Sequence, residues 1–285
     1  MRAVTKRPQL TALDLQHIRH LAQECSHHEG LTMKLNWKTL QSRPGTVTDD
    51  FLMFVDNQLV GYLALYAFNR QEAEVSAMTR PADRRQGIFS QLLAEARHAL
   101  AERNIPDFLF ICEQKSESAC HTMAAIGSAY EFSEYKMMLE QVPALKPNLR
   151  LAMRMAQPDD FPMMAELDKI CFEVEPDSTL ANLSREVQNY HQRNWIIMVD
   201  NTIAGKIQVT IGPEEIYLSG FGIFPEFRGR GYGRSVLTQV VKQLADERRQ
   251  PIALEVAGTN RHALTLYQQC GFREVTAYDY YRQAV

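Results

Sequence analysis

The clearest chemical pattern in the sequence is a basic, glycine-rich stretch, Arg228-Gly229-Arg230-Gly231-Tyr232-Gly233. Glycine lets the backbone approach an anion closely and form a concave nest of N–H groups. An apolar run ending at Pro225 precedes the stretch, as in a strand, and apolar residues with helical spacing follow from Val236 to Leu244. The pattern predicts a strand, a loop and a helix N-terminus, where unpaired N–H groups and the helix dipole favour phosphate.

A second pattern follows in the residues after Pro251. Ile252, Leu254 and Val256 alternate with Ala253, Glu255 and Ala257, which predicts a strand with Glu255 on its more polar side. Asn260 is a suitable N-cap for a short helix that contains Tyr267 and ends before Gly271.

Together the two patterns resemble the GCN5-related N-acetyltransferase (GNAT) superfamily. The first has the form R-x-x-G-x-G, and the second is a complete N-x-x-A-x-x-L-Y-x-x-x-G-F from Asn260 to Phe272. The resemblance covers about Leu151 to Val285. It implies an α/β (α+β layered) fold and acetyl-CoA as the co-substrate. Taken alone, the glycine stretch is also compatible with an ordinary basic turn.

The resemblance implies a set of donor-binding residues. The loop from Arg228 to Arg234 is expected to hold the pyrophosphate, and the strand before it to offer backbone groups to the pantetheine and the thioester. Asn260 is expected to contact the pantetheine arm, with a role as a simple N-cap as the alternative. The predicted acetyl-CoA residues are Gly222, Ile223, Arg228, Gly229, Arg230, Gly231, Tyr232, Gly233, Arg234 and Asn260.

The same resemblance assigns the acid and the base. Tyr267 is the predicted general acid, because a phenol can donate a proton to the departing thiolate. Glu255 is the predicted base for the acceptor amine, and its placement is similar to that in bacterial ribosomal-protein N-terminal acetyltransferases. The alternatives are that Tyr267 only packs against the helix face and that Glu255 is a surface carboxylate. No metal ligands are predicted.

The acceptor is less well defined by the sequence. In this superfamily the loop after the first helix borders the acceptor, and here it contains Glu173, Glu175 and Asp177. Such a rim attracts a cationic amine, although the loop can equally be solvated. The acceptor class therefore stays broad: a small-molecule amine or a protein or peptide amino group.

Composition narrows the class of protein. The chain has 285 residues with 45% hydrophobic and 23% charged residues, which is typical of a globular protein. A formal net charge of −3 argues against sequence-independent binding to nucleic acid or an anionic membrane. Neither a signal peptide nor a transmembrane segment is predicted, and the five scattered cysteines form no C-x-x-C pair. These features predict a cytoplasmic protein.

The two halves of the sequence repeat at a shift of 144 residues. This shift carries Asp56-Asn57 onto Asp200-Asn201, and the other matches also fall at turns, in the glycine loop and on helix faces. We therefore predict two tandem GNAT-like domains, each a mixed sheet flanked by helices: a degenerate domain at 1–142, a linker at 143–150 and a catalytic domain at 151–285.

Only the C-terminal copy keeps the residues that the chemistry needs. In the N-terminal copy Phe89 replaces Gly233, Met123 replaces Tyr267, Ser116 replaces Asn260 and Ile111 replaces Glu255. A structural or dimerising role for that copy, unproductive CoA binding and a separate activity all stay open, and a homodimer is one hypothesis. The prediction is an acetyl-CoA-dependent N-acetyltransferase that works by direct attack of a primary amine. A non-catalytic CoA sensor and a scaffold are the alternatives.

Overall fold

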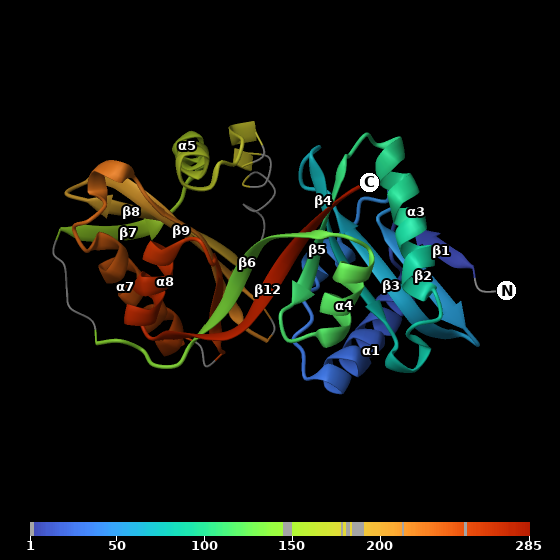
Figure 1. The fold of residues 1–285 in the computed structure, drawn as a ribbon. Helices are drawn as coiled ribbons and strands as arrows, with labels where there is room; N and C mark the ends of the chain where they lie inside the picture. The colour runs from blue at the N-terminus through green and yellow to red at the C-terminus, as the bar shows by residue number, and fades with distance from the viewer. Residues whose placement is uncertain are drawn as a thin grey trace. The chain divides into compact units, whose positions relative to one another are not determined.

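The computed structural model describes residues 3–144, 150–177, 179–180, 183, 191–212, 214–247 and 250–285. These residues form two compact units, one made of Met1–Glu134 with Thr276–Val285 and the other of Tyr135–Val275. Each unit contains a mixed sheet with helices on both faces (Figure 1). The predicted α/β class and the two tandem copies are confirmed.

The sheet of the first unit runs in the order β1-β2-β3-β4-β5-β12, followed by the first part of β6. Side chains alternate along β3, so that Tyr62 and Ala64 pack toward α1 and α2, while Leu63 and Leu65 pack toward α3 and α4. The elements are β1 (Val4–Arg7), α1 (Ala12–Glu29), α2 (Trp37–Gln41), β2 (Asp50–Val55), β3 (Gln58–Tyr66), β4 (Glu72–Thr79), η1 (Pro81–Asp83), α3 (Ile88–Glu102), β5 (Asp107–Glu113), α4 (Glu117–Ala125) and β6 (Ala129–Leu139).

The sheet of the second unit runs from the last part of β6 through β11, β10, β9 and β8 to β7. Helix α5 packs on one face of this sheet, and α7 and α8 cover the other face, where the larger core lies. The elements are β7 (Leu151–Met155), η2 (Pro158–Asp160), α5 (Phe161–Phe172), β8 (Gln192–Val199), β9 (Thr202–Ile211), β10 (Ile216–Ile223), η3 (Pro225–Phe227), α7 (Tyr232–Glu247), β11 (Ile252–Ala257), α8 (Arg261–Gln269) and β12 (Phe272–Ala284).

Backbone geometry repeats between the two copies. Asp56 and Asn57 have φ of 48° and 60°, and Asp200 and Asn201 have φ of 49° and 63°. Both pairs form two-residue hairpin turns with the left-handed conformation that Asp and Asn tolerate. Matching backbone conformations at matching positions support the sequence repeat beyond residue identity.

The two compact units differ from the predicted segments 1–142 and 151–285 in where the final strand of each copy belongs. In β12, Tyr278–Ala284 pairs antiparallel with β5, which belongs to the first unit, and the Thr276 hydroxyl donates to Glu113 at 2.6 Å. In β6, Lys136 forms an ion pair with Glu215 of the second unit at 2.8 Å. Each copy therefore completes its sheet with residues from the other copy's last strand. Residues 145–149 of the predicted linker lie outside the described residues.

Most predicted elements are present with small shifts at their ends. The sequence predicts a helix over residues 11–25; this helix is α1, which begins with a capping box formed by Thr11 and Asp14. The sequence also predicts a helix over residues 179–191, and most of these residues lie outside the described part of the chain. The short elements β1, α2 and β7 were not predicted, because four or five residues give too little periodicity.

Candidate active site

The strand β10 separates from β11 at the predicted donor site. Their parallel pairing covers Ile216–Leu218, whereas β10 continues to Ile223 and β11 to Ala257. A register shift between Ser219 and Gly222 interrupts the pairing of β10 with β9 on the other side. Backbone groups of Phe221, Gly222 and Ile223 are thereby released from the ladder with β11, where a ligand can bind them, while Gly222 and Ile223 keep their pairing with Lys206 and Gly205 of β9.

Two glycines in the loop after β10 are required by backbone conformation. Gly229 and Gly231 have φ of +75° and +78°, and a Cβ added to either would meet no atom within 4 Å. The left-handed conformation therefore selects glycine here, rather than crowding. The loop leads into α7, whose first N–H groups, from Tyr232 to Arg234, have no partner inside the helix.

The side chains of the loop differ in what they offer an anion. Arg228 Nε donates to the Ile223 carbonyl at 2.7 Å, and its Nη2 lies 3.2 Å from Cys171 Sγ, so this guanidinium stabilises the loop itself. Arg230 and Arg234 are exposed and form no ion pair with any described residue. Tyr232 is buried in the core, which leaves its backbone N–H as its contribution.

Gly233 lies in the first turn of α7 and faces the second helix of the site. A Cβ at this position would lie 3.5 Å from Leu266 and 3.8 Å from Phe221. These are ordinary van der Waals distances, so a methyl group fits here, whereas a large ring extends into the space between α7, α8 and β10.

Tyr267 on α8 is half-buried, with its ring edge-on to Phe272 at a centroid distance of 6.1 Å. Among the described residues its hydroxyl has no hydrogen-bond partner. Burial, with a smaller contribution from Cys270, raises the pKa of Tyr267 to about 12. The phenol is therefore protonated at neutral pH and available to donate.

Glu255 and Asn260 lie on the elements predicted for them. Glu255 is half-buried on β11, and its neighbours along the strand, Leu254 and Val256, are buried on the opposite face. Asn260 caps α8, with its Oδ1 accepting from the Ala263 N–H at 3.1 Å. The capping role is thus present, and it leaves the side-chain amide N–H₂ available for a ligand.

Sequence reasoning missed a contact at the C-terminal end of α5. The Cys171 thiol lies 3.9 Å from the Ile223 carbonyl oxygen, and a Cβ at Gly222 would approach it to 3.1 Å. The absence of a side chain at Gly222 therefore allows α5 to pack directly on the released part of β10. Only the glycine within an apolar strand hinted at this close approach.

A buried ion pair beneath α5 was also missed. Lys206 on β9 lies opposite Gly222 and is fully buried; its Nζ lies 2.6 and 2.7 Å from the two carboxylate oxygens of Asp168. The Thr179 hydroxyl also donates to Asp168, at 3.1 Å. The pair holds α5 against the sheet next to β10, the strand predicted to contact acetyl-CoA. A single charged residue among the uncharged residues of β9 was the only signal in the sequence.

The N-terminal copy keeps the loop conformation but changes its chemistry. Arg85 and Gly87 have φ of +62° and +78°, matching Gly229 and Gly231. Arg84, the counterpart of Arg228, forms an ion pair with Glu29. The register of β3 with β4 is regular, without the shift found between β9 and β10. The N-terminal copy thus repeats the backbone frame of the site with different side chains.

Two other kinds of site were sought in the described part of the chain. No group of His, Cys, Asp and Glu side chains there is arranged to hold a metal ion. None of the described helices is long and apolar enough to cross a membrane.

Comparison with known proteins identifies the class. Residues 14–127 and 161–272 each match the model of the acetyltransferase (GNAT) family. The chain therefore belongs to this family, as a tandem member with two copies of the fold, and it is an N-acetyltransferase. Members of the family generally use acetyl-CoA as the co-substrate.

Relatives are found for the whole chain and for part of it. Mycothiol acetyltransferase of Propionibacterium freudenreichii is 24% identical over 291 residues, covering 94% of this chain and 88% of that protein. Ribosomal protein bS18-alanine N-acetyltransferase of Salmonella typhimurium is 29% identical over 83 residues, covering 29% of this chain and 56% of that protein.

Two solved structures cover both copies of this chain. A GCN5-related N-acetyltransferase from Sphaerobacter thermophilus has a TM-score of 0.83 at 17% identity, covering 99% of this chain and 95% of that one. A tandem GNAT protein from the clavulanic acid biosynthesis pathway has a TM-score of 0.77 at 15% identity, covering 100% of this chain and 98% of that one. At these identities the likeness shows the fold.

Proposed function

We propose that the C-terminal copy transfers an acetyl group from acetyl-CoA to a primary amine by direct attack. The observation that carries this proposal is the difference between the copies. The C-terminal copy combines the released strand, a loop of three glycines and a phenol without a partner. The N-terminal copy has Arg85, Phe89 and Met123 at three of the corresponding positions.

The donor is held mainly by the backbone in this proposal. The first N–H groups of α7 and the nest formed by Gly229 and Gly231 receive the pyrophosphate, assisted by the unpaired guanidiniums of Arg230 and Arg234. The thioester lies against the released backbone of Gly222 and Ile223, where N–H donors can polarise its carbonyl. Asn260 donates its amide N–H₂ to the pantetheine arm.

The chemical step needs one base and one acid. Glu255 accepts a proton from the ammonium of the acceptor, directly or through water, and the neutral amine forms a bond to the thioester carbon. The carbon–sulfur bond then breaks, and the Tyr267 phenol donates its proton to the CoA thiolate. The nitrogen loses its second proton to solvent, which leaves the neutral amide and CoA as products. Glu255 then releases its proton to solvent and Tyr267 takes one up, so the net reaction releases one proton.

The acceptor class is proposed from charge. Glu173, Glu175 and Asp177 are exposed in the segment after α5 and together present three negative charges. We call them the acidic rim. A cationic amine is the matching ligand, either a small molecule or a peptide amino group. The mycothiol and bS18-alanine relatives do not choose between these two.

The direct test measures CoA release with a panel of amines that spans polyamines, aminoglycosides, amino acids and peptides. Turnover with at least one amine, abolished by Tyr267→Phe but retained by Met123→Leu in the other copy, supports the proposal. Saturable acetyl-CoA binding without turnover on any amine favours the alternative of a CoA-binding sensor. Absence of acetyl-CoA binding favours a scaffold.

Replacement of Gly233 by phenylalanine is expected to weaken acetyl-CoA binding about tenfold or more, which is about 1.4 kcal/mol. The ring enters the space beside Leu266, and the N-terminal copy has a phenylalanine, Phe89, at the matching position. Gly233→Ala is the matched control and should leave the Kd within about twofold, because its methyl group makes only ordinary contacts. Calorimetric titration measures both constants. Equal affinities of the two variants would remove Gly233 from the donor site.

Neutralisation of the acidic rim, by Glu173→Gln, Glu175→Gln and Asp177→Asn together, is expected to raise the KM for a cationic acceptor several-fold at unchanged kcat. The effect should shrink with added salt, because exposed charges are screened over about 8–10 Å at physiological ionic strength. Steady-state kinetics at low and high salt measure it. Neutralising the exposed Glu102 and Glu117 of the first unit is the control. An unchanged KM in the triple variant would leave the acceptor class open.

A further inference from the structure

The first unit contains a cavity that the proposed activity does not use. It has a volume of about 810 Å³, within the usual range for small-molecule sites. The cavity opens where β4 and β5 diverge: their parallel pairing ends at Val75 and Phe110, and both strands continue beyond it. Two diverging strands bound an elongated slot rather than a round pocket.

The wall of this cavity is apolar at the positions that carry chemistry in the other copy. Ile111 stands in place of Glu255, Met123 in place of Tyr267 and Phe89 in place of Gly233, and all three line the cavity. The ring of Phe89 lies 6.5 Å from that of Phe110. The substitutions convert a reactive polar cleft into a hydrophobic one.

The acidic groups of the wall are already satisfied. Glu29 accepts hydrogen bonds from Ser116 and Ser118 at 2.8 Å and pairs with Arg84. Burial opposes its ionisation, but the bonds from Ser116, Ser118 and Arg84 lower the pKa of Glu29 below its usual value. Glu113 accepts from the Thr32 N–H and the Thr276 hydroxyl, both at 2.6 Å.

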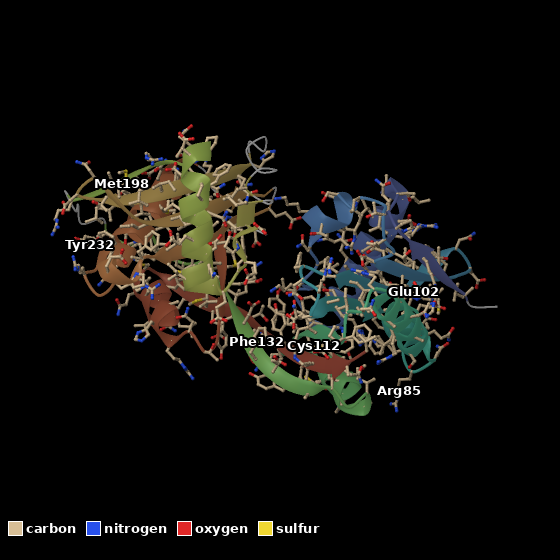
Figure 2. All side chains as sticks on the ribbon, turned by 90° about the horizontal axis from the view of Figure 1, so that it is seen from above. Arg85, Glu102, Cys112, Phe132, Met198 and Tyr232 are labelled. Carbon is tan, nitrogen blue, oxygen red and sulfur yellow. The ribbon has the colours of Figure 1, made fainter. Side chains whose placement is uncertain are left out.

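The basic and thiol groups of the wall are compensated as well. Lys34 pairs with Glu134 at 2.9 Å and donates to the Tyr280 hydroxyl at 2.7 Å. Burial raises the pKa of Cys112 to about 12 and that of Cys25 to about 11, so both thiols remain neutral. Of the charged or titratable lining residues, Arg85 and His121 are exposed at the edge of the cavity, and Figure 2 shows Arg85 at the surface, away from Cys112.

The phosphate-binding features are weakened in the same unit. The ion pair with Glu29 engages Arg84, and Phe89 places a ring where the other copy has only the hydrogen of Gly233. A ligand that depends on pyrophosphate contacts is therefore disfavoured, whereas one that depends on hydrophobic burial is favoured.

We propose that this cavity binds the hydrocarbon chain of an acyl or alkyl ligand, separately from the acetyl-CoA site of the C-terminal copy. The slot between β4 and β5 receives the chain, with Ile111, Met123 and Phe89 along its wall. The inference is independent of the reaction proposed for the other copy.

The test titrates the full-length protein with 1-decanol, decanoate and acetyl-CoA by calorimetry. One decanol or decanoate should bind per chain, and Ala119→Phe, which fills the cavity from α4, should weaken that binding about tenfold or more. Ala263→Phe, the matched substitution in the C-terminal copy, should leave it unchanged. Acetyl-CoA should bind once per chain, and Ala119→Phe should not affect it.

Ile111→Glu provides a second variant, since the corresponding strand position of the other copy carries glutamate. Its carboxylate in the apolar wall should also weaken decanol binding about tenfold or more. Similar affinities for decanol and decanoate would indicate that the hydrocarbon chain of the probe is recognised. Binding of only one of them would identify the preferred head group. The proposal is overturned if neither probe binds saturably, or if Ala263→Phe rather than Ala119→Phe removes binding. A second acetyl-CoA per chain that disappears in Ala119→Phe also overturns it.

Discussion

Tyr267→Phe is expected to lower kcat about 100-fold or more, the range of general acid catalysis. The substitution keeps the ring and its edge-on contact with Phe272 but removes the proton that the departing thiolate needs. The affinity for acetyl-CoA should stay nearly constant. Steady-state kinetics with the best amine of the panel, together with calorimetry for the donor, separate the two effects.

A tyrosine in the other unit provides the control. Burial also raises the pKa of Tyr281 to about 12, but this residue lies on the part of β12 that belongs to the first unit. Tyr281→Phe should therefore leave kcat within about twofold of the wild type. Survival of turnover in Tyr267→Phe to the same extent would show that Tyr267 only packs and that water protonates the thiolate.

The pKa of Tyr267 also fixes the sign of the pH dependence. A phenol donates only while protonated, and burial raises its pKa from its ordinary value to about 12. The rate should therefore show no loss from ionisation of this residue as the pH rises through 10. A falling limb near pH 10 that is present in the wild type and absent in Tyr267→Phe would contradict the assignment.

Lys206→Met is expected to lower the free energy of unfolding of the second unit by about 3–5 kcal/mol. Asp168 would remain buried with the Thr179 hydroxyl but without its cation. Because this pair holds α5 against the sheet next to β10, acetyl-CoA binding should weaken as well. Urea unfolding measures the stability loss.

The two tryptophans of the chain allow each unit to be followed. Trp37 lies in the first unit and Trp195 in the second, so a Trp37→Phe background reports the second unit alone. Lys242→Met, which removes an exposed pair with Asp246 on α7, is the matched control and should cost less than about 0.5 kcal/mol. If Lys206→Met lowered the free energy of unfolding by as little as Lys242→Met, this would show that water reaches Asp168.

The sequence alone was sufficient to predict the two copies and the elements around the site. Gly229 and Gly231 are informative because a left-handed backbone favours glycine, and Asn260 because it caps its own helix. The hairpin turns at Asp56-Asn57 and Asp200-Asn201 are local in the same sense. Each of these signals depends on a few neighbouring residues, so a single sequence records it.

The tertiary structure decided what depends on distant partners. A matched glycine illustrates this: a Cβ at Gly205 would lie 2.2 Å from the Gly222 carbonyl oxygen, whereas one at Gly61 would meet the Ile88 side chain at 2.3 Å. The sequence has glycine at both matched positions, but the reasons differ. The missing side chain at Gly205 allows the close approach of β10, and the one at Gly61 allows the close approach of α3.

The roles of individual side chains follow the same rule. Tyr232 is buried although its neighbours in the loop are exposed. The Arg228 side chain donates to the Ile223 carbonyl of the preceding strand instead of being available to an anion. The pairing of β12 with β5 and the ion pair of Lys206 with Asp168 join residues far apart in the chain. No local pattern encodes such contacts, because their energy depends on which surfaces the folded chain brings together.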